Sequence, residues 1–384
     1  MIVFLENYFK DIVLCAGIIY LTLAIILLLF KVPQTEYFER YRASKRYIAF
    51  GFVIISATIF TWLYNFDGNW TKANPLTDSI DLIYYYLIGI VFSYGFSNLL
   101  DKHYINKRRV TLDLCKWAVC VTCCIISMQE SIHTNIQEFC IFVSFLLFLE
   151  FIIQYIYYFR KMYIKNSRML EDYFTAETVN FVSWIKKSIT LIFMSALFAV
   201  ITINEGAIFN WIFQIYNISI NIYITICVIN YSSIYAKLKQ AEPKDKEELS
   251  KQEAMAQRFY ANSSEQSKLL LQKKIRIWAS TKSYQNNQFT IDELATHLGT
   301  NKYYLSRLIN EKKHMNFSNW ISSLRIADAK EILQAEPNLR LEEVAFRVGF
   351  SSPSYFSKVF SNLEGISPSV WVRNLERNSA GELP

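Results

Sequence analysis

Histidine, glycine and proline are scarce in this chain of 384 residues, which has 4 His, 10 Gly and 7 Pro. The sequence contains no HExxH zinc-protease motif, no phosphate-binding P-loop and no glycine-rich nucleotide loop. It also lacks an aspartate-rich cluster of the kind that supports catalysis. We therefore predict that the protein is not an enzyme, and we expect no cofactor.

Cysteine is present, but not in a pattern that binds metal. All seven cysteines lie before residue 230, within apolar runs. The densest group, Cys120, Cys123 and Cys124, has neither a second pair of ligands nor a nearby histidine, which a structural zinc site would need. A thiol in such a run behaves as a small apolar side chain of a membrane helix. We predict no metal site.

Long apolar runs dominate residues 1–236, and hydrophobic residues make up 52% of the whole chain. A transmembrane helix needs about 20 mostly apolar residues, and most of these runs approach or exceed that length. We expect that the first run is not a cleavable signal peptide, because its N-terminal flank carries Glu6, Lys10 and Asp11 instead of a basic region. We predict about seven membrane helices, of which the sixth is the shortest, near residues 12–30, 47–64, 80–100, 112–128, 136–158, 188–202 and 207–235.

Basic residues alternate between the two ends of these runs. The segments after the first, third and fifth runs hold fifteen Lys and Arg, whereas the alternate segments hold only Lys10 and Lys72. The fifteen are Lys31, Arg40, Arg42, Lys45, Arg46, Lys102, Lys107, Arg108, Arg109, Arg160, Lys161, Lys165, Arg168, Lys186 and Lys187. Because basic residues stay on the cytoplasmic side, we predict an external N-terminus and, after seven crossings, a cytoplasmic C-terminus.

Polar residues within the runs are candidates for sensing a signal. Gln214, Asn217 and Asn221 share one helical face of the seventh run, which should look into the bundle. They either form interhelical hydrogen bonds or line a signal-sensing cavity or sliding surface. Glu150 lies deep in the fifth run, where it is protonated or paired with Lys116, unless Lys116 reaches the cytoplasmic surface instead. A structural pair and a sensing residue are equally compatible with this placement.

A polar, charged segment, residues 237–272, follows the apolar part of the chain. It contains Pro243 and shows no sustained apolar periodicity, which is typical of a partly helical linker. It has too few apolar heptad positions to predict a coiled coil. The sequence therefore leaves open whether the protein is a homodimer.

The last part of the chain contains one pattern twice. Residues 291–299 (IDELATHLG) recur fifty positions later as residues 341–349 (LEEVAFRVG). Residues 304–308 (YLSRL) then recur as residues 355–359 (YFSKV), one position further on. Each copy predicts a helix, a tight turn and a second helix, which is the helix-turn-helix layout.

Local signals mark the ends of these helices. Gly299 and Gly349 stand where a left-handed turn residue costs least. Thr290 with Glu293 predicts a capping box for the first helix. Ser352, which precedes a proline, predicts the N-cap of the last helix of the second copy.

Motifs in and between the two copies occur in an order that resembles a known family. The motifs are residues 341–345, 348–351, 354–360 and 365–369, together with a linking helix at residues 317–321 and 324–333. Through these motifs, residues 273–384 resemble the DNA-binding domain of the AraC family of bacterial transcription regulators. The resemblance implies two recognition helices that enter the DNA major groove, promoter DNA as the partner, and contact with RNA polymerase.

The chain departs from the family pattern at two places. Lys313, His314 and Met315 replace the glycine usually found after the first recognition helix, so we expect a differently shaped turn there. Arg340 occupies a helix-start position where Ser or Thr is more typical, which predicts a weaker cap.

The recognition helices supply the candidate DNA-binding residues. In the first, predicted over residues 301–310, Leu305, Leu308 and Ile309 face the core. Arg307 suits a bidentate contact with guanine, and Tyr303 suits a thymine methyl group. The outward residues of the two helices are Lys302, Tyr303, Ser306 and Arg307 in the first, and Ser352, Ser354, Ser357 and Lys358 in the second. By resemblance, Tyr303, Ser306 and Arg307 stand at base-reading positions.

The distribution of positive charge indicates the same candidate DNA-binding residues. Residues 273–384 hold 15 Lys and Arg against 11 Asp and Glu, so the net charge is only +4 and a basic patch must be local. It gathers around the first recognition helix at Lys302, Arg307, Lys312 and Lys313. Such groups would supply most of the affinity for DNA through its phosphates. The short outward side chains of the second recognition helix predict less base reading and more phosphate contact.

The sequence thus predicts an all-α protein in three parts: a transmembrane bundle over residues 1–236, a linker over 237–272 and a tandem helix-turn-helix domain over 273–384. The predicted function is a multi-pass regulator in the bacterial cytoplasmic membrane, controlled by an unidentified signal ligand. The alternative is a membrane receptor or transporter whose tail binds a protein partner instead of DNA.

Overall fold

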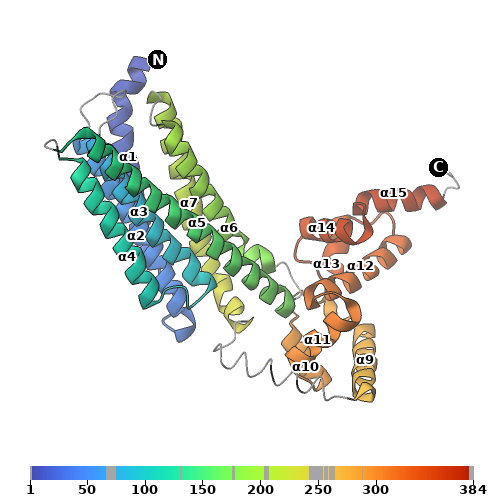
Figure 1. The fold of residues 1–384 in the computed structure, drawn as a ribbon. Helices are drawn as coiled ribbons and strands as arrows, with labels where there is room; N and C mark the ends of the chain where they lie inside the picture. Colours follow the sequence, from blue (N-terminus) through green and yellow to red (C-terminus); the bar gives the residue numbers. More distant parts are fainter. Residues whose placement is uncertain are drawn as a thin grey trace. The chain divides into compact units, whose positions relative to one another are not determined.

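The computed structural model is all-α over the residues it describes, which are 2–65, 75–129, 132–174, 178–202, 207–241, 254, 258, 264–287 and 289–379 (Figure 1). The chain divides into two compact units. The first, here the N-terminal unit, comprises Met1–Asn166 and Ser183–Lys239. The second, the C-terminal unit, comprises Ser167–Val182 and Gln240–Pro384. Most of the predicted linker, residues 242–263 except 254 and 258, lies outside the described residues.

Seven long helices cover the described part of the N-terminal half, and three of them, α5, α6 and, by its last two residues, α7, extend into the C-terminal unit. They are α1 (Ile2–Leu29), α2 (Glu39–Asn65), α3 (Pro75–Leu100), α4 (Lys107–Ser127), α5 (Thr134–Tyr173), α6 (Thr178–Thr202) and α7 (Ala207–Ala241), with a short 3₁₀ helix η1 (Glu36–Phe38) before α2. Six of them, α1 to α5 and α7, are long and apolar enough to cross a membrane, which indicates a membrane protein. The predicted crossing by α6 is not among these six and stays a prediction.

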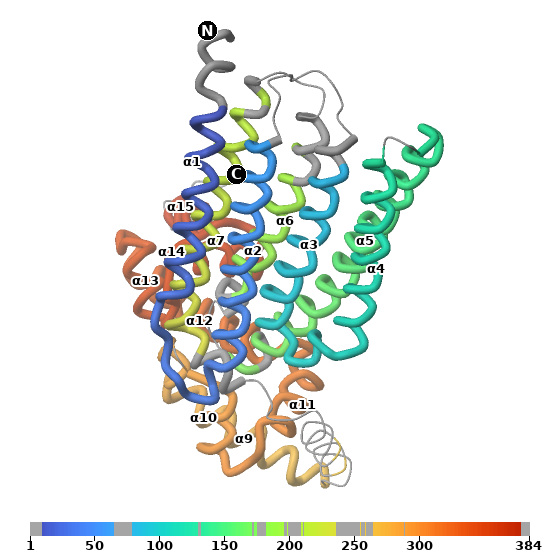
Figure 2. The backbone as a smooth tube through the Cα atoms, turned by 90° about the vertical axis from the view of Figure 1, so that its left-hand side faces the viewer, coloured from blue at the N-terminus to red at the C-terminus, as the bar shows by residue number. Residues whose placement is uncertain are grey.

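Neighbouring helices of the N-terminal unit pack through small and polar residues as well as apolar ones. Figure 2 shows α1, α2 and α3 side by side and α4 next to α5. The Ser56 hydroxyl of α2 donates to the Gly17 carbonyl of α1 at 2.8 Å. The Ser79 and Ser127 hydroxyls join α3 to α4 at 2.8 Å. Small residues allow this close approach, and buried hydroxyls need such partners where water is absent.

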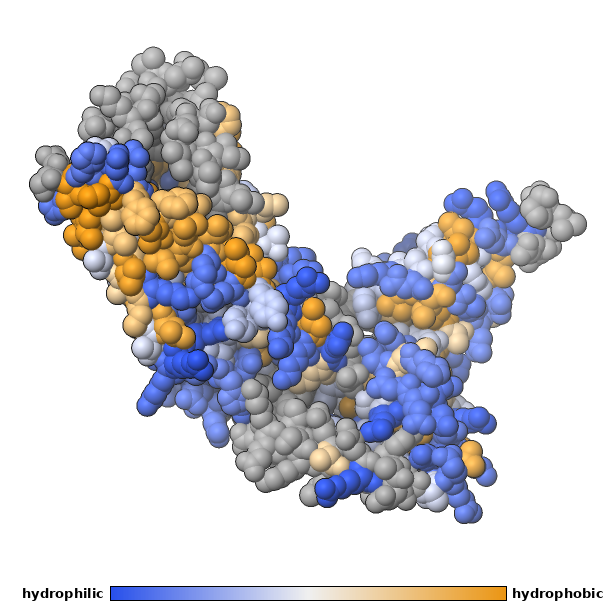
Figure 3. Space-filling view, in the orientation of Figure 1, coloured by the Kyte–Doolittle hydropathy of each residue, from blue (hydrophilic) through white to orange (hydrophobic). Residues whose placement is uncertain are grey.

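Large apolar side chains remain exposed on the outer faces of these helices. Phe139 and Ile153 of α5 are 65% and 59% exposed, and Val119 of α4 is 50% exposed. Figure 3 shows hydrophobic residues forming a continuous area over this unit. In water such an area would be costly, but lipid tails are as apolar as these side chains. The outer surface therefore suits a bilayer.

Basic residues near the start of α2 close the ends of its neighbours. The Lys45 ammonium, only 7% exposed, donates to the Phe30 carbonyl just beyond α1 at 2.5 Å. The Arg40 guanidinium donates to the Asn98 and Leu99 carbonyls at the end of α3, at 2.9 and 3.2 Å. Helix C-termini leave carbonyls without intrahelical partners and favour cations. The sequence pattern of Lys45 and Arg40 predicted only the membrane topology. In the structure these two residues also cap the C-termini of α1 and α3.

The C-terminal unit contains two helix-turn-helix units joined by a long helix. Its elements beyond residue 240 are α9 (Glu265–Ser280), η2 (Ser283–Gln285), α10 (Ile291–Leu298), α11 (Lys302–Lys313), α12 (Phe317–Ala335), α13 (Leu341–Arg347), α14 (Pro353–Glu364) and α15 (Pro368–Ser379). The first unit is α10–α11, the second is α13–α14, and α12 connects them (Figure 1). The predicted repeat is therefore confirmed as a repeat of structure.

The predicted helix ends are found where the sequence placed them. Thr290 and Glu293 form the capping box: the Glu293 amide donates to the Thr290 hydroxyl at 3.3 Å, and the Thr290 amide donates to the Glu293 carboxylate at 2.8 Å. His314 takes the left-handed conformation, φ +54°, in place of the missing glycine. Arg340 makes no side-chain cap, as its type predicted.

A buried arginine attaches the segment between α9 and α10 to α12. Arg325 is 1% exposed and donates to the Tyr284 carbonyl at 2.7 and 2.8 Å and to the Asn286 carbonyl at 2.9 Å. Burial lowers the pKa of Arg325 to about 10, which still leaves the guanidinium charged at neutral pH. Asp328, 5% exposed, accepts from the Tyr284 hydroxyl at 2.9 Å and from the Gln285 amide at 2.8 Å. Buried polar groups satisfied in this way hold one geometry.

The same segment touches the second helix-turn-helix unit. Gly349, at the turn between α13 and α14, has φ +94°, and a Cβ atom there would lie 2.1 Å from the Gln285 carbonyl oxygen. The Arg325 guanidinium lies 5.7 Å from the centre of the Phe350 ring. Residues 282–286 therefore contact both α12 and the second helix-turn-helix unit, and they hold these two parts together.

Gly349→Ala should destabilise the C-terminal unit by about 3 kcal/mol or more, because alanine at this position combines a steric overlap with the Gln285 backbone and an unfavourable φ. Gly299→Ala is the matched control: its φ is +70°, but nothing lies within 4 Å of the added Cβ. The control should lose only about 1–2 kcal/mol. Urea unfolding of residues 265–384, followed by tryptophan fluorescence, measures both. Equal losses would contradict the close approach.

Candidate nucleic-acid interface

The first recognition helix, α11, has one buried and one accessible face. Leu305, Leu308 and Ile309 are 0%, 1% and 3% exposed, which confirms the predicted core face. Asn301 caps the helix by accepting the Tyr304 amide at 2.8 Å. Of the four residues predicted to face outward, Arg307 is exposed, and Lys302, Tyr303 and Ser306 are half-buried. These four positions lie outside the apolar core, so polar side chains are tolerated there.

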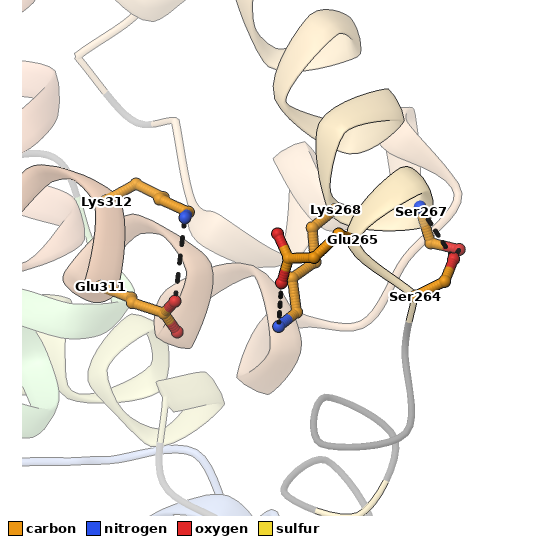
Figure 4. Close-up of polar contacts among 6 residues, drawn as sticks. All are labelled: Ser264, Glu265, Ser267, Lys268, Glu311 and Lys312. Atoms are coloured by element: carbon orange, nitrogen blue, oxygen red, sulfur yellow. Dashed lines mark hydrogen bonds and ion pairs between the residues drawn. The ribbon is translucent and has the colours of Figure 1, made fainter.

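The basic residues of α11 form ion pairs at its two ends. The Lys302 ammonium lies 3.2 Å from the Asp292 carboxylate of α10. Lys312 lies 3.9 Å from Glu311 within α11, and at the start of α9 Ser264 caps the helix and Lys268 pairs with Glu265 (Figure 4). Ion pairs this accessible contribute little to stability. The amides at the N-terminus of α11 favour an anion.

The second recognition helix, α14, also has the predicted polarity. Phe356 and Phe360 are fully buried, and Ser354 and Lys358 are exposed. Ser357 and Ser352 are half-buried. The Ser352 hydroxyl accepts the Tyr355 amide at 3.3 Å, so its first role is the N-cap of α14. Lys358 is the one long cation among these four residues, which suits contact with phosphate.

The polar face of α7 points into the N-terminal unit. Asn221 and Thr225 are 6% and 4% exposed, and Gln214 and Asn217 are half-buried. The Ser195 hydroxyl of α6 hydrogen-bonds to the Asn217 side chain, and the Asn221 amide donates to the Asn217 carbonyl at 2.8 Å. Of the two interpretations, interhelical hydrogen bonding thus has a described contact. The sensing role stays a prediction.

Lys116 and Glu150 are paired, which was one of the alternatives left open by the sequence. The Lys116 ammonium lies 2.7 and 2.6 Å from the two Glu150 oxygens, between α4 and α5. The Gln154 amide also donates to Glu150. A neighbouring contact was not foreseen: the Tyr94 hydroxyl of α3 donates to the Asp113 carboxylate of α4 at 2.8 Å. Polar contacts therefore connect α3, α4 and α5.

Sequence reasoning missed the polar residues that position the recognition helices. Arg325 and Asp328 were noted only as part of the linking-helix motif. Their one signal was an arginine and an aspartate three residues apart among apolar positions of an amphipathic helix, which indicates polar partners in the core. The partners themselves, Tyr284 and Gln285, gave no signal.

A known family and several curated proteins resemble the part of the chain that forms these helix-turn-helix units. Residues 294–374 match the family model described as "Helix-turn-helix domain". The regulatory protein PocR of Salmonella typhimurium is 26% identical over 97 residues, which are 25% of this chain and 32% of PocR. The HTH-type transcriptional activator AarP of Providencia stuartii is 33% identical over 85 residues, 22% of this chain and 62% of AarP. The HTH-type transcriptional activator RhaR of Cronobacter sakazakii is 31% identical over 83 residues, 22% of this chain and 29% of RhaR.

The likeness is confined to part of each protein. This chain spans between 29% and 62% of the length of these three relatives. No solved structure matches the chain. The C-terminal part of the chain thus contains a helix-turn-helix domain, and the helices before it lie outside the matched residues.

Arg325→Leu should destabilise residues 265–384 by about 3 kcal/mol, because the Tyr284 and Asn286 carbonyls lose buried, charge-assisted hydrogen bonds. Arg347→Leu is the control: Arg347 is half exposed and pairs with Glu343 one turn away, so its loss should cost at most about 0.5 kcal/mol. Urea unfolding measures both, and hydrogen exchange at residues 283–286 should quicken only for Arg325→Leu. A fully stable Arg325→Leu variant would contradict the role of this network.

Proposed function

We propose that this protein is a membrane-anchored transcription regulator of AraC type, which binds promoter DNA with α11 and α14 and responds to a signal received by its membrane helices. The observation that carries the proposal is a tandem helix-turn-helix domain in one chain with six candidate membrane spans. Promoter DNA is its partner, and RNA polymerase is a further partner by family resemblance. The lipid bilayer is a third partner, and it surrounds the helices of the N-terminal unit.

Sequence-specific reading is proposed for α11. Arg307 is exposed and carries the fork of donors that matches the acceptor edge of guanine in the major groove. Tyr303 and Ser306 stand beside it, and Lys302 at the start of the helix is placed for phosphate. In α14, Ser354, Ser357 and Lys358 suit phosphate positioning. This division of roles between α11 and α14 follows from side-chain length, because a short serine hydroxyl reaches less far toward a base edge than an arginine does.

The two recognition helices suit successive turns of one DNA face. The connecting helix α12 has 19 residues, which span about 28 Å at 1.5 Å per residue. Together with the helices at its ends, this suits half-sites about 34 Å apart. One chain therefore has the reach to read two half-sites, whether or not it dimerises.

The membrane topology follows from the basic residues. We propose seven crossings, including α6, with an external N-terminus and with the helix-turn-helix domain in the cytoplasm, where promoter DNA is found. Arg40 and Lys45, which close the ends of α3 and α1, lie on the side that the fifteen basic residues share. The bacterial cytoplasmic membrane is the corresponding location.

Arg307→Ala in residues 265–384 should weaken binding to the duplex directly upstream of the protein's own gene by about 1–3 kcal/mol, because a base contact is lost. Lys302→Ala should weaken binding to specific and random duplexes alike and reduce the salt dependence by about one phosphate contact. Fluorescence anisotropy at several salt concentrations separates the two effects. A domain that prefers no sequence and is indifferent to Arg307 would contradict specific reading. A tail that binds no DNA would favour the alternative, a protein partner.

Reporter fusions test the topology. Alkaline phosphatase joined after residue 384 should be inactive and a fluorescent protein there should be bright, because the C-terminus is expected in the cytoplasm. The same pair joined after Lys72, in an alternate segment, should give the opposite result. An active phosphatase after residue 384 would remove the domain from DNA and contradict the proposed function.

A further inference from the structure

A segment from between two membrane helices belongs to the C-terminal unit. Residues 167–182, which form the end of α5 and the start of α6, cluster with residues 240–384 and not with the rest of the bundle. Residues 175–177 lie outside the described part of the chain. The described residues of this segment contact the first helix-turn-helix unit, so the unit contains more than the repeat.

Tyr173, the last residue of α5, makes two of these contacts, one with Asp292 and one with Lys302. Its hydroxyl donates to the Asp292 carboxylate of α10 at 2.7 Å, and it is 8% exposed. The Lys302 ammonium lies 4.9 Å from the centre of its ring, a cation–π distance. Asp292 in turn holds Lys302 at 3.2 Å. Tyr173, Asp292 and Lys302 thus form a closed triangle of polar contacts.

The backbone supports the same placement. Phe174 forms an isolated antiparallel bridge with Thr290, the N-cap of α10. Burial and the Asp292 carboxylate raise the pKa of Tyr173, so its hydroxyl keeps its proton and remains a donor to Asp292. Side chain and backbone together hold the end of α5 on the face formed by Thr290, Asp292 and Lys302.

That face is also the one DNA would use. Lys302 is the first residue of α11, and the N-terminus of a recognition helix is where a helix-turn-helix unit meets the DNA backbone. A phosphate at Lys302 must take the place of both the Asp292 carboxylate and the Tyr173 ring. The two occupants therefore compete for one position.

We propose that the end of α5 is an intramolecular competitor of DNA: Tyr173 and Phe174 occupy the phosphate-contacting start of the first recognition helix and must leave before DNA binds. The inference rests on the proposed function and adds its regulation. Since Tyr173 ends the same continuous helix as the candidate span Thr134–Leu170, a change in the membrane part of α5 reaches the recognition helix through the chain itself. Lys302 links the two states, since it binds Tyr173 in one and phosphate in the other.

Full-length protein in lipid nanodiscs and a random-sequence duplex at low salt test the competition, because contact with phosphate does not depend on sequence. Tyr173→Ala should raise the affinity about fivefold or more, the usual scale of a coupling between two sites. Tyr173→Phe should raise it less, because it loses the hydrogen bond but keeps the ring. The control is Tyr37→Ala, which removes a tyrosine that is 57% exposed and belongs to the N-terminal unit.

An affinity of Tyr173→Ala equal to or below that of the unaltered protein would overturn the competition while leaving the proposed function intact. Absence of DNA binding by every one of these proteins would overturn the proposed function and, with it, this inference.

A second measurement leaves the aromatic ring in place. With p-benzoylphenylalanine at position 173, illumination should crosslink α5 to the peptide that contains residues 290–302, and excess duplex should reduce the yield. A yield unchanged at saturating duplex would overturn the competition, since both occupants would then bind together.

Discussion

A buried arginine, Arg325, organises the C-terminal unit. A guanidinium in an apolar interior is stable only if its donors are matched, and Arg325 finds carbonyl acceptors on Tyr284 and Asn286. Asp328, one turn further along α12, binds the side chains of the same segment. The segment is thereby fixed, and its Gln285 carbonyl lies where only a residue without a side chain, Gly349, fits beside it. The position of the second helix-turn-helix unit against α12 depends on this chain of contacts.

The N-terminal unit obeys a related constraint in a different solvent. Lipid offers no hydrogen bonds, so each polar group within the membrane requires a protein partner. Lys45 and Arg40 supply donors to carbonyls at helix ends, and Lys116 and Glu150 satisfy each other. The apolar outer faces of α4 and α5 need no such partners. Polar contacts therefore gather between helices, which is also where a change of packing would alter them.

The two constraints meet on α5, one helix that begins among the membrane spans and ends on the first helix-turn-helix unit. An ordinary linker would let the DNA-binding domain act independently of the membrane. In the proposed competition, a helix end that covers Lys302 makes DNA binding depend on the membrane helices, because removing Tyr173 from Lys302 and admitting phosphate are one exchange of partners. This gives the membrane anchor a physical reason beyond localisation.

Features encoded by neighbouring residues were predicted from the sequence. The capping box of Thr290, the turn at Gly299, the core face of α11 and the repeat of the whole pattern each depend on residues a few positions apart. Six of the seven apolar runs form candidate membrane spans for the same reason, since length and composition are local properties. The outward positions of Arg307 and Lys358 follow from helical periodicity alone.

Tertiary structure decided the contacts between residues distant in sequence. Arg325 and Tyr284 are 41 positions apart, and Tyr173 and Asp292 are 119 apart. An arginine within an amphipathic helix indicates that a partner exists but cannot say which carbonyl it is, and a tyrosine at the end of an apolar helix reads as an ordinary membrane-interface residue. Periodicity and capping determined the helices, while the pairing of distant polar groups, which depends on how the helices pack, determined what holds the recognition helices and what covers one of them.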